Sequence, residues 1–211
     1  MKVNMAKYIL IGGGEIGRGN TPYETKEIEE EIVKLSNKEH PNFLFIGLAS
    51  SHSDSYYDQI KKIYKDLGCE TVYLKKSNVI NNPNIVENKI NSADIIYIGG
   101  GDTIKLLNYV KDYHIDKLLN SVKDKDIVIA GISAGAILLS KEGYSDSYIL
   151  RGEKDKHEFI KGLNFIDIAI SPHYDKESDK TKELLKDIGN RKVYCISNGA
   201  ALIIKDNKID I

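Results

Sequence analysis

Short apolar runs alternate with charged segments along the chain, and this alternation predicts strands separated by helices. The charged segments place their apolar residues three and four positions apart, whereas the apolar runs are nearly continuous. The predicted strands cover residues 8–11, 43–49, 71–74, 94–98, 126–130, 167–171 and 193–197. The predicted helices cover residues 25–38, 55–68, 103–113 and 175–189.

The continuous apolar character of these strands indicates that both faces of the sheet are covered. We therefore expect an α/β fold, a doubly wound, mostly parallel sheet with helices on both faces, formed by one domain over residues 1–211. The last segment, AALIIKDNKIDI, predicts a C-terminal hairpin that turns at Asp206, Asn207 and Lys208. Sheets of this kind bind ligands at the carboxyl ends of their strands, so the loops after strands are the candidates for a functional site.

Composition narrows the class of protein further. The formal net charge of −1 gives no electrostatic reason to expect nucleic acid or an anionic membrane as a partner. Cys69 and Cys195 lie far apart without a neighbouring metal-ligand pattern, so we expect reduced, buried thiols and neither metal nor cofactor. No secretory signal is evident, and no run approaches the roughly 20 apolar residues of a membrane span, so we expect a cytoplasmic protein.

Two of the loops after strands are rich in glycine. GGGEIG, residues 12–17, fits the dinucleotide pattern G-x-G-x-x-G, but the next helix starts only near Glu24. The pattern also needs an acidic residue about 20 positions on, after a second strand, and the segment there, IEEEIVKL, still reads as helix. This favours a tight glycine turn over a nucleotide site. In IGGGDT, residues 98–103, three glycines let a ligand approach the backbone, and Asp102 can cap the helix that begins at Thr103.

The third loop, GISAG, has the pattern G-x-S-x-G between a predicted strand and an apolar helix, which is the context of a nucleophile elbow. The turn would expose Ser133 Oγ, with Gly131 and Gly135 removing Cβ atoms that would clash and the N–H of Ala134 facing a developing oxyanion. His173 in SPHYD also follows a strand and is the candidate general base.

The sequence does not identify the acid that would orient the base as clearly as it identifies the nucleophile and the base. Asp146 lies between the candidate nucleophile and base in chain order. Asp175, Glu153 and Asp155 are alternatives, and spacing does not choose among these carboxylates.

With these motifs in place, the chain resembles the peptidase E (aspartyl dipeptidase) and cyanophycinase family of serine peptidases, whose fold is like that of class I glutamine amidotransferases. The resemblance covers nearly the whole chain, through IGGGDT, GISAGAILL, SDS, KGLNFI, SPHYD and NGAALII in that order. It implies Ser133 as nucleophile, His173 as general base and Asp146 as orienting acid. It further implies Gly100, Gly101 and Ala134 as the oxyanion hole.

The same resemblance implies a small peptide substrate, with N-terminal Asp-X dipeptides as one option. An aspartyl preference needs a cation, and Arg151 is the only arginine near the predicted site in the sequence, so it is the candidate substrate-binding residue. An exposed edge strand would allow a homodimer.

Two other functions stay open. An α/β-hydrolase-like esterase shares the order Ser–Asp–His, but the chain is short and has no HGGG-type segment. A non-catalytic small-molecule-binding protein on the same fold is the other alternative, and the presence of both Ser133 and His173 argues against it.

Overall fold

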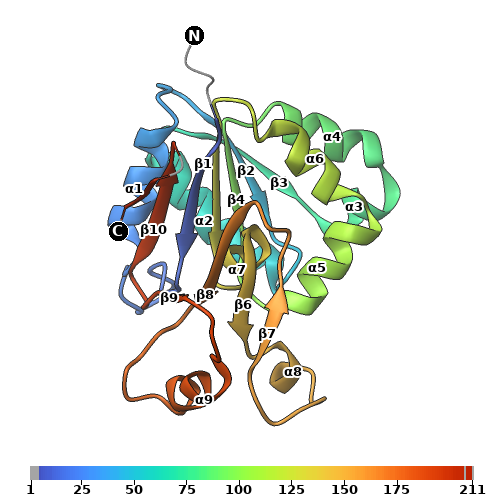
Figure 1. Cartoon of the computed structure of the whole chain (residues 1–211). Coiled ribbons are helices and arrows are strands. Elements are labelled where there is room, and N and C mark those ends of the chain that lie inside the picture. Colours follow the sequence, from blue (N-terminus) through green and yellow to red (C-terminus); the bar gives the residue numbers. More distant parts are fainter. Residues whose placement is uncertain (1–4, 207, 211) are drawn as a thin grey trace.

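The computed structural model describes residues 5–206 and 208–210, and its main sheet is mostly parallel (Figure 1). Within the described residues this sheet consists of β1 Lys7–Ile11, β2 Asn42–Ile46, β3 Glu70–Leu74, β4 Ile95–Ile98, β5 Val128–Ile132, β10 Ala201–Lys205 and β11 Lys208–Asp210. The strand order is β11-β10-β1-β5-β4-β2-β3. Strands β1 to β5 pair in parallel, and β10 and β11 extend the sheet antiparallel beyond β1.

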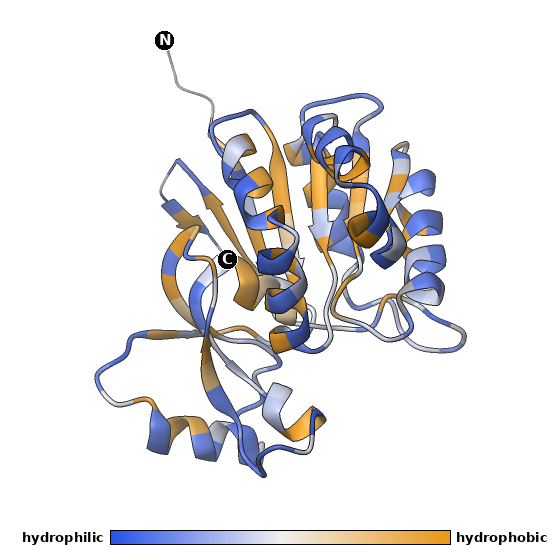
Figure 2. Ribbon diagram, turned by 90° about the vertical axis from the view of Figure 1, so that its right-hand side faces the viewer, coloured by the Kyte–Doolittle hydropathy of each residue, from blue (hydrophilic) through white to orange (hydrophobic). Residues whose placement is uncertain are grey.

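Helices cover both faces of this sheet, which confirms the predicted α/β fold class. The helices within the described residues are α1 Lys26–Leu35, α2 Ser53–Asp66, α3 Lys76–Asn81, α4 Pro83–Asn91, α5 Thr103–Asp112, α6 Ile115–Val122, α7 Ala134–Leu139, α8 Ser147–Leu150 and α9 Asp179–Asp187, of which α8 and α9 lie beyond the ends of the main strands. Figure 2 shows apolar strands between helices whose outer surfaces are hydrophilic.

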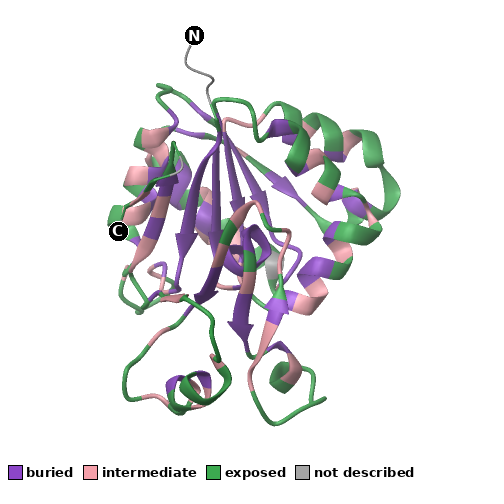
Figure 3. Cartoon of the chain, viewed as in Figure 1, coloured by how far each residue is buried: buried purple, intermediate pink, exposed green. Residues whose placement is uncertain are grey.

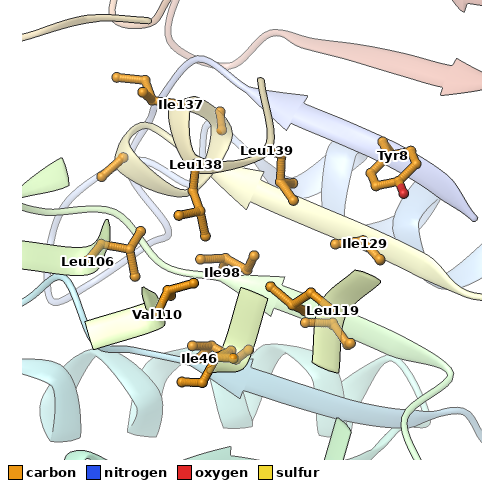
Figure 4. Close-up of a cluster of buried hydrophobic side chains, with 14 of the residues drawn as sticks. Tyr8, Ile46, Ile98, Leu106, Val110, Leu119, Ile129, Ile137, Leu138 and Leu139 are labelled. Atoms are coloured by element: carbon orange, nitrogen blue, oxygen red, sulfur yellow. The ribbon is translucent and has the colours of Figure 1, made fainter. Parts of the chain in front are cut away.

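Two hydrophobic layers separate the helices from the sheet. Neighbouring residues of β1 illustrate the division: Ile9 packs in the layer of α1 and α2, and Leu10 packs in the layer of α3 to α7. This is the alternation of side chains that a strand imposes. Figure 4 shows the second layer, where Leu138 of α7 lies near Leu106 of α5 and Ile98 of β4. Burial on both faces explains why the sequence of the central strands is apolar throughout (Figure 3).

A second, smaller sheet lies beyond the carboxyl ends of the main strands (Figure 1). It is formed by β6 Ser140–Ser145, β7 Glu158–Lys161, β8 Ile166–Ser171 and β9 Val193–Cys195, in the order β7-β6-β8-β9. The predicted strands at 167–171 and 193–197 belong to this sheet and not to the main one. Strand β6, SKEGYS, was not predicted from the sequence. Small polar residues such as Ser140 and Ser145 occupy buried positions in it, so the segment has no apolar pattern.

The C-terminal hairpin is confirmed by the antiparallel pairing of β10 with β11, in which Lys205 pairs with Lys208. Asn207, in the predicted turn, lies outside the described residues. Cys69 is a buried free thiol as expected, whereas Cys195 is exposed, so its predicted burial was wrong. In the described part of the chain, no helix is long and apolar enough to cross a membrane.

The strand order brings the three predicted loops together. Strand β5 lies between β1 and β4, so the loops after these three parallel strands emerge side by side at one edge of the sheet. They are the GGGEIG, GISAG and IGGGDT loops. The end of β8 leads to His173, and the segment after β9 leads into β10 beside β1.

Candidate active site

Ser133 occupies a sharp turn between β5 and α7, with φ 54° and ψ −111°. This positive φ is uncommon for a residue with a side chain and is a strained backbone conformation. The flanking glycines make the turn sterically allowed, because a Cβ on Gly131 would lie 2.4 Å from the backbone of Gly135. A Cβ on Gly135 would lie 2.2 Å from the carbonyl oxygen of Ile98 in β4. Helix α7 can therefore begin directly above the sheet with Ser133 at its first turn.

Ser133 belongs to a chain of hydrogen bonds with His173 and Asn198. The Ser133 hydroxyl donates to His173 Nε2 over 2.9 Å, and His173 Nδ1–H donates to Asn198 Oδ1 over 2.8 Å. An acceptor at Nδ1 holds the proton on that nitrogen, so Nε2 is left free to accept from the serine. This is the tautomer that a general base for a serine nucleophile requires.

Backbone carbonyls at the end of β1 and in the first glycine loop bind the three segments that carry these residues. The carbonyls of Ile11, Gly12 and Gly13 accept hydrogen bonds from the N–H groups of Ser133, His173 and Gly199, each over 2.9 Å. Three successive carbonyls thus fix the backbone of Ser133, of His173 and of the residue after Asn198. Residues 12–15 form an irregular loop without a turn, so the prediction of a tight glycine turn in GGGEIG was wrong.

The space beside Gly13 is filled by the side chains of His173 and Asn198. A Cβ on Gly13 would lie 2.3 Å from Cε1 and Nδ1 of His173 and 2.5 Å from Asn198 Oδ1. Helix α1 begins only at Lys26, well after the glycines, so this loop does not open a helix as a dinucleotide site requires.

A surface pocket of about 240 Å³ opens over Ser133 and His173. Gly100 and Gly101 of the IGGGDT loop line it, and a Cβ on Gly100 would lie 3.3 Å from Ser133 Cβ. Tyr56 of α2 forms another wall, with its ring packed against Phe45 at 5.0 Å between centroids. Glycine backbone therefore lies directly beside the serine, where amide N–H groups could stabilise an oxyanion.

The two serines of the SDS motif bind the loop that lines this pocket. Asp102 caps α5, and its Oδ1 accepts from the N–H groups of Ile104 and Lys105. The next residue, Thr103, donates its N–H to Ser147 Oγ over 2.8 Å, and its hydroxyl lies 3.0 Å from Ser145 Oγ. These buried contacts tie the IGGGDT loop to β6 and α8.

Asp146 does not occupy the position that the resemblance implies. The group at His173 Nδ1 is Asn198, whereas the Asp146 side chain is exposed at the start of α8, where its charge acts on Lys180. Asp175 caps its own turn through the N–H of Glu177. The sequence analysis did not predict Asn198, because it considered only carboxylates as partners of the histidine. The signal that could have indicated Asn198 is its position in the SNG segment, which follows strand β9 just as His173 follows β8.

Arg151 is not among the residues that line the pocket. Its guanidinium pairs with Glu153 at 2.7 Å and with Asp102 at 3.6 Å. The arginine that lines the pocket with Ser133 is Arg18, from the loop after β1. Arg18 was not predicted as a pocket residue because it lies far from the GISAG motif in the sequence. The two segments come together only because β1 and β5 are neighbours in the folded sheet.

Three titratable groups around the site have shifted pKa values. Burial lowers the pKa of Lys180 to about 8, and its ammonium donates over 2.6 Å to the carbonyl of Pro172, next to His173. Burial raises the pKa of Glu29 to about 7 against the opposing effect of the hydrogen bond from Tyr64. Glu29 in turn raises the pKa of Tyr56 in the pocket wall, adding to the larger effect of burial there.

Comparison with known proteins gives concordant matches. The sequence model of a family described as Peptidase family S51 matches residues 6–211. A protein of Bacillus subtilis (strain 168) named uncharacterized peptidase YgaJ is 30% identical over 201 residues, which cover 94% of this chain and 83% of that protein. Peptidase E of Shewanella denitrificans is 29% identical over 161 residues, 74% of this chain and 63% of its own length.

The fold is also similar to solved structures. A crystal structure of a Listeria monocytogenes EGD-e protein assigned to peptidase E superposes with a TM-score of 0.73. The match covers 98% of this chain and 97% of that chain, at 22% sequence identity. The resemblance to the peptidase E family drawn from the sequence motifs is confirmed by these matches.

Proposed function

Because the chain belongs to peptidase family S51 and is a peptidase, we propose that it hydrolyses dipeptides or short peptides through an acyl-enzyme on Ser133. The observation that carries the proposal is the 2.9 Å hydrogen bond from Ser133 Oγ to His173 Nε2. This distance lies in the range needed for proton transfer between a nucleophile and its base.

In the first step, Ser133 Oγ attacks the scissile carbonyl carbon while His173 Nε2 takes the hydroxyl proton. Asn198 holds the imidazole in place through Nδ1 and supplies no charge. The carbonyl oxygen becomes an oxyanion, for which the N–H groups of Ala134 and of Gly100 or Gly101 are the donors. Each such donor contributes about 3–4 kcal/mol to lowering the barrier.

Breakdown of this intermediate expels the amine, which takes the proton from His173. Water then attacks the Ser133 ester, with His173 again accepting the proton. The open position of His173 at the surface supports this second step, because solvent reaches the imidazole directly. Release of the carboxylic acid restores Ser133.

The preference for short peptides rests on the size of the pocket. Its volume of about 240 Å³ lies below the roughly 300–1,000 Å³ of typical ligand pockets. A dipeptide or the end of a short peptide suits a space of this size better than a long polypeptide segment.

The test compares the wild type with Ser133→Ala on a dipeptide panel that includes Asp-X, with a p-nitrophenyl ester assayed alongside. We expect Ser133→Ala to lower kcat/KM for peptides by at least about 10³-fold. Ser121→Ala, which changes an exposed serine on α6, is the matched control and should keep full activity. A fluorophosphonate probe followed by peptide mass analysis should label Ser133 in the wild type.

Three results would contradict the proposal in distinct ways. Equal peptide cleavage by the wild type and Ser133→Ala would remove Ser133 as the nucleophile. Ester turnover without peptide cleavage would favour an esterase. Binding of peptides without turnover of either substrate would favour a non-catalytic protein.

A further inference from the structure

A second pocket lies between helix α1 and strand β10, next to the segment that follows Asn198 (Figure 1). We call it the α1–β10 pocket, and its volume is about 380 Å³. A space of this size lies within the range of typical ligand pockets, roughly 300–1,000 Å³. Most of its lining is apolar and comes from Ile9 of β1, Ile28 and Ile32 of α1, and Ala201 and Ile203 of β10.

The chain enters β10 through small residues, and this leaves space beside α1. Gly199, Ala200 and Ala201 follow one another where a large side chain would fill the gap between the helix and the sheet. Ile28 of α1 and Ile203 of β10 pack against the hydrophobic layer of α1 and α2, but both keep part of their surface exposed. Exposed apolar surface on both elements favours a ligand with an apolar body, because binding removes that surface from water.

The charged residues of this pocket are both acidic. Glu27 and Glu31 lie about one turn apart on α1, and none of the described residues that line the pocket is a lysine, an arginine or a histidine. Glu31 accepts a hydrogen bond from Lys34 over 2.8 Å, but the Lys34 side chain is 77% exposed, so this surface ion pair is weak. The other ion pair within the described part of α1 joins Lys26 to Glu30 and leaves Glu27 unpaired. The two carboxylates therefore favour a cationic group at this pocket.

The wall formed by Gly199 and Ala200 is bound to the glycine loop of the candidate active site. The Gly199 N–H donates to the Gly13 carbonyl over 2.9 Å, and the Gly12 N–H donates to the Ala200 carbonyl over 3.0 Å. The same two wall residues follow Asn198 immediately in the chain. A ligand in the α1–β10 pocket therefore contacts backbone that is joined directly to Asn198 and to the glycine loop.

We propose that the α1–β10 pocket binds a small amine with an apolar body, and that this ligand changes the rate of peptide hydrolysis. The apolar body packs against the isoleucines of α1 and β10. The protonated nitrogen binds the carboxylates of Glu27 and Glu31, where charge-assisted hydrogen bonds are stronger than neutral ones. The pocket shares no described lining residue with the pocket over Ser133, so the two sites are distinct. The effect on rate rests on the peptidase function proposed above, whereas the binding does not.

Binding is tested with three probes: phenethylamine, phenethyl alcohol and methylamine, each titrated into the protein and followed by NMR. The first two have the same apolar body, and only the amine is charged at neutral pH. We expect phenethylamine to bind at least about tenfold more tightly than either phenethyl alcohol or methylamine, which lacks the apolar body. The backbone amide signals of Gly199, Ala200 and Ala201 should shift with the same dissociation constant.

The double variant Glu27→Gln and Glu31→Gln removes both charges and keeps the shape of the pocket. It should weaken binding of phenethylamine at least about tenfold, and binding of the alcohol by less than about twofold. Glu30→Gln is the matched control, because Glu30 is an exposed glutamate of the same helix that does not line the pocket. It should leave both affinities unchanged. Equal affinity of the amine and the alcohol, or an equal loss in the control and the double variant, would overturn the site.

The effect on hydrolysis is measured with a dipeptide that the wild type cleaves, at saturating phenethylamine. We expect kcat to change at least about twofold in the wild type and in Glu30→Gln, and the amine to have no effect on the double variant. Binding of the amine without a change in kcat would overturn the coupling to hydrolysis. If the wild type cleaves no peptide, the NMR titration still decides the binding site, and only the peptidase proposal fails.

Discussion

His173 Nδ1 lies 2.8 Å from Oδ1 of Asn198, a neutral amide in the position where serine hydrolases with a Ser-His-Asp triad have a carboxylate. An amide oxygen fixes the tautomer and the orientation of the imidazole as a carboxylate does. It does not offset the positive charge that the imidazole would acquire in the reaction proposed above. Cysteine peptidases with a Cys-His-Asn arrangement use the same neutral partner.

Asn198→Ala should lower kcat about 10- to 100-fold with little change in KM, because the imidazole loses its fixed orientation while the pocket is unchanged. Asn198→Asp should retain activity and move the acid limb of the pH–rate profile to higher pH, since a carboxylate favours the protonated ring. Profiles of kcat/KM from pH 5 to 9 measure both effects. Asp146→Asn is the control and should keep the kcat of the wild type. If Asp146→Asn lowers kcat as much as Asn198→Ala does, Asp146 and not Asn198 orients the imidazole.

Gly13→Ala should reduce kcat at least about 100-fold in a protein that still folds. The added methyl would lie 2.3 Å from the His173 ring, at a backbone φ of 152°, and would displace the base from Ser133. Steady-state kinetics together with circular dichroism test this. Gly19→Ala lies in the same loop with φ 57° and nothing within 4 Å of the new methyl, so it should remain active. Equal inactivation of the two variants would show that strain in the loop, and not contact with His173, is responsible.

Ser133→Gly should be more stable than Ser133→Ala, the reverse of the ordinary order. Glycine usually costs about 0.5–1 kcal/mol relative to alanine, but at φ 54° alanine keeps the backbone strain that glycine relieves. We expect a difference of about 1 kcal/mol in the free energy of unfolding, measured by denaturant titration of the two inactive proteins. A Ser133→Ala protein more stable than Ser133→Gly would mean that the turn is not strained.

Stability should fall as the pH rises from about 4.5 to about 7, and Glu29→Gln should remove this dependence. The Glu29 carboxyl binds its proton more tightly in the folded protein, with a pKa of about 7 against 4.5. Its contribution is therefore complete below pH 4.5 and is lost as the pH passes 7, with a total of about 3 kcal/mol. Denaturant titrations at pH 4.5, 6 and 8 measure it.

Glu27→Gln, on the exposed side of the same helix α1, is the control for this measurement. It should keep the pH dependence of the wild type. If Glu29→Gln and the wild type show the same slope of unfolding free energy against pH, the buried carboxyl is not the group that titrates.

Features that one segment determines by itself were predictable from the sequence. The apolar strands of the main sheet and the GISAG turn follow from local patterns, and the structure has both. Asn198 and Arg18 acquire their positions from strand order, because β10 and β5 flank β1 only in the folded sheet. The second sheet was not predicted for a different reason. Its buried positions include hydroxyl side chains whose hydrogen bonds are made locally, as from Ser140 to the Ile137 carbonyl. Such residues can be buried without giving the sequence an apolar pattern.

The three successive carbonyls of Ile11, Gly12 and Gly13 have a consequence for biosynthesis. Ile11 ends β1 and the two glycines follow it, yet their partners are the N–H groups of Ser133, His173 and Gly199, which come much later in the chain. Ser133 is synthesised before His173 and Asn198, and β1 can pair with β10 only after all three residues have been made. A nascent or prematurely terminated chain therefore carries Ser133 without an assembled site. The hydrogen bonds that join Ser133, His173 and Asn198 can therefore form only after the segment that carries Asn198 has been made.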